Sequence, residues 1–227
     1  VADINGDGIP DLIVTHSSTN VSIVLGNGDG TFQPELPFDV GRSISSVRVA
    51  DVNLDGKPDL IGATDNSGPD AIAVLIGNGN GTFQSPMYFN VTGNPTSLSD
   101  DSLTLADLNN DGRSDIIAVS GLSNSISILL ANSDGSLQSE QHFSTGDWPL
   151  SVAVTDLTGD GFADLVIPNN FSSDISVLLN NGDGTFQTQQ RFNVGSGPQA
   201  VVAADLNGDG SRDIVTANSD SNDVSVL

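Results

Sequence analysis

The 227-residue sequence contains no cysteine, so disulfide bonds do not hold its fold. Basic residues are scarce as well: 6 Lys and Arg stand against 29 Asp and Glu, which gives a formal net charge of −23. A chain this acidic is repelled by nucleic-acid phosphates and by anionic membrane surfaces, so we expect no nucleic-acid partner. No apolar run approaches the ~18 residues of a membrane-spanning helix, so we expect no membrane insertion.

Glutamate is nearly absent. Only Glu35 and Glu140 are Glu, and every other acidic residue is Asp. A surface that is charged only for solubility usually mixes Glu with Lys. Short Asp side chains among glycines instead indicate loops that coordinate a cation.

The sequence repeats itself with a period of about 50 residues. The segment ADINGDGIPDLIV at 2–14 returns in similar form at 50–62, 106–118, 155–167 and 204–216. A glycine-rich segment such as VLGNGDGTFQ keeps the same period at 24–33, 75–84, 129–138 and 178–187. We interpret the chain as one array of five repeats, approximately 1–45, 46–101, 102–150, 151–199 and 200–227.

Each repeat is expected to form four short strands, which we name A to D. In the second repeat the predicted strands cover 46–50, 59–64, 72–76 and 83–91, because their apolar and β-branched residues suit strands and no 3.6-residue period is sustained. The Gly- and Asn-rich segment between C and D is typical of a tight hairpin. Four antiparallel strands repeated in this way predict an all-β fold, a β-propeller of four-stranded blades.

An Asp-rich loop of the form Asp-x-Asn-x-Asp-Gly-x-x-Asp joins strands A and B of every repeat. Oxygen-bearing side chains fall at positions 1, 3, 5 and 9, and the main-chain carbonyl of position 7 adds another oxygen. The candidate side-chain ligands are Asp3, Asn5, Asp7 and Asp11; Asp51, Asn53, Asp55 and Asp59; Asp107, Asn109, Asp111 and Asp115; Asp156, Thr158, Asp160 and Asp164; and Asp205, Asn207, Asp209 and Asp213. The candidate carbonyls belong to Ile9, Lys57, Arg113, Phe162 and Ser211.

Oxygen ligands in flexible number suit Ca²⁺, and the absence of His and Cys from the loops disfavours zinc. We therefore predict about one Ca²⁺ per repeat, up to five. The fourth loop has Thr158 in place of Asn and is expected to bind more weakly or through water. The alternative is that the loops are simple polar Asx turns. A helical EF-hand loop fits poorly, since strand-like segments follow each loop and Glu is absent from position 12.

The Asp loops, the GNGDGTFQ-like hairpins and the Phe-x-Val-Gly segments together resemble the FG-GAP/VCBS repeat family. This family includes the propeller repeats of integrin α-subunits and many bacterial surface proteins. The resemblance covers the whole chain and implies a propeller, usually seven-bladed, with Ca²⁺ in the A–B loops. It also implies roles in adhesion and, for some members, lectin activity.

The repeat pattern leaves three complete blades and two partial ones, because the first repeat lacks strand A and the last lacks strand D. Three alternatives remain open. The chain is a fragment of a larger propeller or array, a five-unit ring that closes imperfectly, or a unit whose strands are completed by neighbouring copies.

The connections between B and C and between D and A differ from repeat to repeat, which is typical of a recognition surface. We expect a protein or glycan ligand on this B–C/D–A loop face, or neighbouring copies of the chain. Trp148, Tyr88 and Phe171 are candidates for stacking against a sugar, although packing explains each of them as well.

No catalytic constellation is visible, since His16 and His142 are isolated in sequence, and we expect no enzyme. The prediction is an extracellular, secreted or cell-surface, calcium-binding β-propeller module for adhesion or ligand recognition. The alternatives are a structural subunit of an extracellular fibre or surface assembly, and a lectin.

Overall fold

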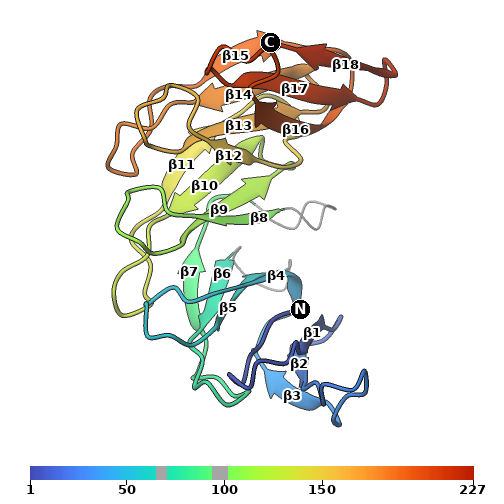
Figure 1. Ribbon diagram of the computed structural model, residues 1–227, viewed down its shortest axis with the longest axis vertical. Coiled ribbons are helices and arrows are strands. Elements are labelled where there is room, and N and C mark those ends of the chain that lie inside the picture. The colour runs from blue at the N-terminus through green and yellow to red at the C-terminus, as the bar shows by residue number, and fades with distance from the viewer. Residues whose placement is uncertain (65–70, 94–101) are drawn as a thin grey trace.

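The computed structural model describes residues 1–64, 71–93 and 102–227. In these ranges the chain forms 18 β-strands in five antiparallel sheets (Figure 1). A helix long and apolar enough to cross a membrane is not found in them. Two of the variable connections lie largely outside the described residues: the B–C connection at 64–71 and the D–A connection at 90–103 of the second repeat.

Each sheet is built from one repeat, and its strands follow one another in chain order. Sheet 1 contains β1 (Leu12–Thr15), β2 (Asn20–Val24) and β3 (Leu36–Asp39); sheet 2 contains β4 (Ile44–Ala50), β5 (Asp59–Thr64), β6 (Ala71–Leu75) and β7 (Met87–Asn90). Sheet 3 contains β8 (Leu103–Ala106), β9 (Asp115–Ser120), β10 (Ser125–Leu129) and β11 (Gln141–Ser144). Sheet 4 contains β12 (Ala153–Thr155), β13 (Asp164–Asn169), β14 (Asp174–Leu178) and β15 (Gln190–Asn193), and sheet 5 contains β16 (Pro198–Ala204), β17 (Asp213–Asn218) and β18 (Asp223–Val226).

The four-stranded antiparallel unit predicted from the period is confirmed, and strands A, B and C of the second repeat match β4, β5 and β6 closely. Strand D is shorter than predicted: the sequence indicates 83–91, whereas β7 spans Met87–Asn90. The difference arises at the glycine hairpin, where Phe83 forms an isolated bridge with Gly77. Pairing then stops for three residues before β7 joins β6 in register.

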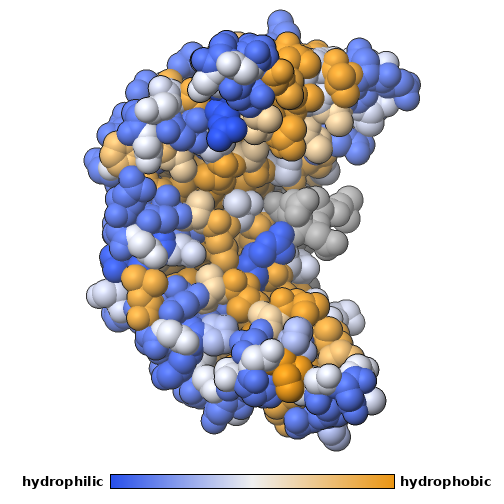
Figure 2. Space-filling view, in the orientation of Figure 1, coloured by the Kyte–Doolittle hydropathy of each residue, from blue (hydrophilic) through white to orange (hydrophobic). Residues whose placement is uncertain are grey.

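The five sheets stand side by side in an open arc, with the first and last sheets at its two ends (Figure 1). The strands of the described residues therefore form separate sheets and no continuous closed one. The space-filling view has a C-shaped outline, with apolar side chains gathered along the concave side (Figure 2).

Burial of both faces explains why the central strands are predominantly apolar. Every residue of β5, β6, β9, β10, β13 and β14 is buried. Successive side chains of a strand point to opposite faces, so Ile116 packs in the cluster between sheets 2 and 3, and Ile117 packs in the cluster between sheets 3 and 4. Each inner sheet thus contributes to two cores.

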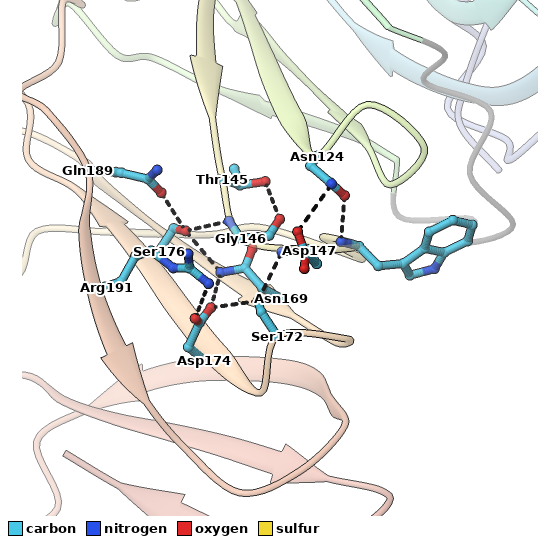
Figure 3. A network of polar contacts seen from close by, with 11 residues as sticks. Asn124, Thr145, Gly146, Asp147, Asn169, Ser172, Asp174, Ser176, Gln189 and Arg191 are labelled. Carbon is cyan, nitrogen blue, oxygen red and sulfur yellow. Dashed lines mark hydrogen bonds and ion pairs between the residues drawn. The ribbon is translucent and has the colours of Figure 1, made fainter.

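A polar seam also joins neighbouring sheets on the B–C/D–A side. The segment that leaves one sheet is fastened to the next: the Gly146 N–H donates to Ser176 Oγ at 3.2 Å, and the Asp147 N–H donates to Ser172 Oγ at 2.9 Å (Figure 3). The Gly195 N–H repeats the first contact with Ser225 Oγ at 2.9 Å. These bonds fasten sheet 3 to sheet 4 and sheet 4 to sheet 5.

The seam between sheets 3 and 4 contains a buried charge. Asp174 is buried and pairs with Arg191, and it also accepts hydrogen bonds from Asn169 Nδ2 at 2.7 Å and Ser172 Oγ at 3.0 Å (Figure 3). A buried carboxylate is costly unless it is paired and hydrogen-bonded, and both conditions are met.

We expect Gly146→Ala to destabilise the array by about 1–3 kcal/mol, the usual cost of overpacking. A Cβ at this buried position would lie 2.5 Å from Ser172 Oγ and 2.6 Å from Asp174 Oδ1. Urea unfolding measures the effect, with Ser144→Ala, an exposed change on β11, as the control. Equal stabilities of the two variants would contradict the role of Gly146 in the seam.

A second prediction concerns pH. Glu140 joins sheets 2 and 3, because its carboxylate accepts hydrogen bonds from the Thr92 N–H at 2.7 Å, the Thr92 hydroxyl at 2.9 Å and the Ser127 hydroxyl at 2.5 Å. Burial raises the pKa of Glu140, but these hydrogen bonds outweigh burial and hold the pKa below its ordinary 4.5. Because the folded pKa is depressed, the stabilisation is present above about pH 4.5 and is lost as the pH falls through the lower, folded pKa.

The measurement is the difference in Tm between the natural chain and Glu140→Gln at several pH values. Because the two chains contain the same Asp residues, the contribution of Asp titration to Tm cancels in this difference. We expect the natural chain to be the more stable at pH 7 and the difference to shrink below pH 4.5. A difference that does not depend on pH would show that the charge of Glu140 has no part in joining the sheets.

Candidate metal centres and the opposite loop face

The Asp loops all lie at the same end of their sheets. They cover residues 3–11, ahead of β1, and then 51–59, 107–115, 156–164 and 205–213, each between the first two strands of its sheet. The predicted ligands of each repeat therefore lie in a single loop.

Position 1 of each loop caps main-chain amides. In the second loop Asp51 accepts from the Asp55 N–H at 3.0 Å and from the Gly56 N–H at 2.8 Å. The glycine has a φ of 82°, a left-handed conformation that a residue with a Cβ resists. The equivalent bonds of Asp3, Asp107, Asp156 and Asp205 to the glycine at position 6 measure 2.8, 2.8, 2.9 and 3.0 Å.

Positions 3 and 5 form successive Asx turns. Asn53 Oδ1 accepts from the Asp55 N–H at 3.1 Å, and Asp55 Oδ1 accepts from the Lys57 N–H at 2.9 Å. The fourth loop differs, because Thr158 stands in place of Asn: the Asp160 N–H donates to Asp156 at 3.2 Å, without the second acceptor that Asn supplies in other loops.

Position 9 has a structural role that the sequence reasoning missed. Asp115 is fully buried, and its two carboxylate oxygens accept from the Leu108 N–H at 2.9 Å and the Ala131 N–H at 2.8 Å. Leu108 belongs to the Asp loop, and Ala131 begins the glycine hairpin. The same double contact recurs at Asp11, Asp59 and Asp164, which are equally buried. The sequence signal for this contact is that the Asp loop and the glycine hairpin recur with the same period.

The carboxylates of one loop influence each other electrostatically. Burial raises the pKa of Asp115 to about 6; the hydrogen bonds from Ala131 and Leu108 oppose this, and the negative charges of Asp111 and Asp107 raise the pKa further. For Asp59, too, burial raises the pKa, against the bonds from Gly77 and Val52 and together with the charges of Asp55 and Asp51. The carboxylates at positions 1 and 5 thus act electrostatically on the carboxylate at position 9.

Two loops have a cation at position 7. Lys57 Nζ lies 3.5 Å from Asp55 Oδ2, and Arg113 Nη2 lies 2.6 Å from Asp111 Oδ2. Position 7 in the other loops is Ile9, Phe162 or Ser211, so those side chains bring no positive charge.

The donor set of each loop consists of oxygen atoms alone, which fits a hard cation such as Ca²⁺. Residues 1–64, 71–93 and 102–227 contain no group of three or more His, Cys, Asp or Glu side chains gathered closely enough to hold a metal ion. In the described geometry the side chains at positions 1 and 5 bind main-chain amides instead, and a cation would draw them inward. The metal assignment therefore stays a prediction.

The aromatic candidates at the other end of the sheets have different roles. Tyr88 lies on β7; its hydroxyl donates to the Val40 carbonyl, and the Arg42 guanidinium lies 4.5 Å from its ring centre. Tyr88 therefore joins sheets 1 and 2. Trp148 and Phe171 stack on each other with ring centres 5.1 Å apart and an angle of 20° between the planes.

The two histidines each lie near a serine and a glutamate. His16 Nε2 lies 2.9 Å from Ser22 Oγ and 4.0 Å from Glu35 Oε2, so one ring nitrogen makes both contacts. His142 Nδ1 lies 3.6 Å from Glu140, whose carboxylate accepts the Ser127 hydroxyl. In neither group does the imidazole stand between serine and carboxylate, as general-base activation of the serine requires.

The model of the FG-GAP-like repeat matches the chain over residues 3–62, 51–118, 107–167 and 156–216. The chain belongs to the FG-GAP-like repeat family. Each match runs from one Asp loop through the glycine hairpin to strand B of the next repeat. This confirms the family predicted from the Asp loops and hairpins. No curated protein matches the chain.

Solved structures share this FG-GAP-like repeat protein's fold at low sequence identity. A periplasmic gluconolactonase from Pseudomonas aeruginosa is 18% identical, with a TM-score of 0.61 over 98% of this chain and 64% of its own. A protein of unknown function from Desulfotomaculum acetoxidans DSM 771 is 16% identical, with a TM-score of 0.59 over 96% and 65%. The chain thus spans just under two thirds of either structure, and the likeness shows the fold alone.

A lectin from Agrocybe aegerita that recognises non-reducing terminal N-acetylglucosamine is 22% identical to the chain. The comparison covers 100% of this chain and 78% of the lectin, with a TM-score of 0.45. At that score the likeness carries no argument about what the FG-GAP-like chain binds.

We expect Asp115→Asn to lower the free energy of unfolding by about 1–3 kcal/mol, because the new amide group leaves a buried main-chain N–H without an acceptor. Urea unfolding in the presence of EDTA measures this without any contribution from metal. Asp220→Asn, at an exposed position, is the control. Full stability of Asp115→Asn would contradict the role of this carboxylate in joining loop and hairpin.

Proposed function

We propose that the chain is a calcium-stabilised β-propeller module that recognises a ligand through its B–C/D–A loop face. The observation that carries the calcium part is that every repeat has an Asp-rich loop with oxygen-bearing residues at positions 1, 3, 5 and 9 around a glycine turn, and within such a loop the charges of Asp107 and Asp111 act on buried Asp115. Like charges in contact repel, and a divalent cation relieves the repulsion.

The residues that would hold the ion are the predicted ones. Side chains at positions 1, 3, 5 and 9 and the carbonyl at position 7 supply five oxygen donors, close to the six to eight that Ca²⁺ takes with water included. The ion would contribute positive charge at the end of the sheets. The chain's own residues would orient the donors, because the buried Asp at position 9 is fixed by two main-chain amides.

We further propose a secreted or cell-surface location. Extracellular modules bind Ca²⁺ with dissociation constants of about 10⁻⁴–10⁻³ M, which loops exposed to solvent and tied to one sheet each would suit. Recognition is assigned to the B–C/D–A face because its loops vary between repeats on a scaffold that is buried on both faces. Support for the propeller form comes from five similar sheets in an arc.

A structural assembly built from copies of the chain is the second candidate. It is favoured by the exposed apolar side chains of sheet 5, where Val202, Val224 and Val226 each expose more than half of their surface. Negative-stain electron microscopy of untreated protein distinguishes the two: single arcs or rings support recognition, and fibres support assembly.

The calcium proposal predicts that the Tm rises with CaCl₂ and does not rise with NaCl of equal ionic strength. An ion that binds only the folded state adds about 2.7 kcal/mol per site at a concentration one hundred times its dissociation constant. Asp55→Asn should lower the bound calcium by about one ion per chain, whereas Asp29→Asn, in a glycine hairpin, should leave it unchanged. Absence of bound calcium in elemental analysis, with no response of the Tm, would refute the proposal.

A further inference from the structure

We propose that Phe171, supported by Trp148 and flanked by Asn124 and Asp147, forms a binding site for an uncharged saccharide. The site lies on the B–C/D–A loop face between sheets 3 and 4, and it rests on the recognition role proposed above for that face. It names the chemical class of the ligand, which the repeat pattern and the calcium loops leave undefined.

The first observation is an exposed aromatic surface with a rigid support. Phe171 exposes 69% of its surface, and the Trp148 ring lies behind it at 5.1 Å with nearly parallel planes. Burial of a Phe side chain stabilises a folded chain, and Phe171 forgoes most of that stabilisation. A flat, exposed ring with a second ring beneath it offers an apolar platform to a ligand.

The platform is fixed by hydrogen bonds between two loops. The Asn170 N–H donates to the Trp148 carbonyl at 3.0 Å, and the Phe171 N–H donates to the Asp147 carbonyl at 3.0 Å. The two rings therefore come from different loops whose backbones are paired directly beside them. A preformed surface of this kind loses little entropy on binding.

A third loop, from the neighbouring sheet, completes the site. Asn124 lies between β9 and β10, and its Oδ1 accepts from the Trp148 N–H at 2.8 Å. Trp148 has a φ of 60°, which is rare and unfavourable for a bulky residue, so the surrounding contacts must hold it there.

The polar groups beside the rings are an amide and a carboxylate. Asn124 Nδ2 lies 3.3 Å from Asp147 Oδ1, and Asp147 is exposed (Figure 3). A carboxylate offers about four acceptor positions, and the contact with Asn124 uses one of them. Hydroxyl groups are the donors that such a carboxylate accepts, and a pyranose combines them with a face of C–H groups that suits an aromatic ring.

Charge decides against other ligands that stack on aromatic rings. The chain has a net charge of −23 and the site contains a carboxylate, so acidic sugars and nucleotides would be repelled. The described B–C loops of repeats 1, 3 and 5, at 15–20, 120–125 and 217–223, contain no aromatic residue. The proposal is therefore one site per chain and not one per repeat.

The chain has a single tryptophan, so its fluorescence reports on this site alone. The experiment titrates the full chain with glucose, galactose, mannose, N-acetylglucosamine and their β-linked disaccharides, and records Trp148 emission. We expect a saturable change for at least one of these saccharides. Phe171→Ala should weaken that binding at least tenfold, whereas Phe32→Ala, an exposed phenylalanine in a glycine hairpin at the opposite end of the sheets, should not change it.

Two outcomes would overturn the proposal: the absence of a saturable response to every saccharide, or an unchanged affinity in Phe171→Ala. A response to a proline-rich peptide and to none of the sugars would replace the saccharide with a protein ligand. The rise of Tm with CaCl₂, measured on the same variants, separates this result from the calcium proposal. Phe171→Ala should keep the rise of Tm with CaCl₂. Absence of sugar binding with a retained calcium response would contradict only the saccharide site. Absence of the calcium response with retained sugar binding would contradict only the proposed metal loops.

Discussion

The structure depends on the burial of both faces of each inner sheet. The six central strands of sheets 2, 3 and 4 are buried at every residue, and their alternate side chains enter two different clusters. A sheet of this kind has no face on which to meet water, so it is stable only between neighbours. The packed sheets hold the rest of the molecule in position, including the loops at both ends of the sheets.

The buried Asp at position 9 is where the core and the Asp loop meet. A carboxylate removed from water is unfavourable by itself, and the raised pKa of Asp115 expresses that cost. The two main-chain amides that it accepts from offset the cost, and they come from different turns. The same carboxylate therefore satisfies buried N–H groups and brings negative charge to the loop. The carboxylate accepts the two main-chain hydrogen bonds with one set of lone pairs. As a proposed metal ligand it would use other lone pairs of the same two oxygens.

Local pattern sufficed for strands A to C of the second repeat, for the positions of the Asp loops and for the family, because each of these repeats within about 50 residues and follows from side-chain alternation and turn chemistry. The local pattern could not predict the contacts between sheets. Tyr88 looked like a stacking residue in sequence, but sheets 1 and 2 lie together and its hydroxyl meets Val40. Trp148 and Phe171 belong to loops separated by β12 and β13, and nothing in either segment indicates that the rings stack. The small rotations between successive sheets, which decide whether an arc closes, are not encoded in any single repeat.

The two ends of each sheet differ in how they depend on their neighbours. An Asp loop takes its predicted ligands from one repeat, whereas the aromatic site combines Asn124 of repeat 3 with Phe171 of repeat 4. The ends are separated by a strand of six residues, about 20 Å at ~3.3 Å per residue, so a cation in the loop makes no contact with a ligand on the opposite face. Any influence of calcium on recognition must therefore pass through the relative placement of the sheets. The hydrogen bonds from Gly146 and Asp147 to sheet 4 are the contacts that would transmit a change in this placement to the aromatic platform.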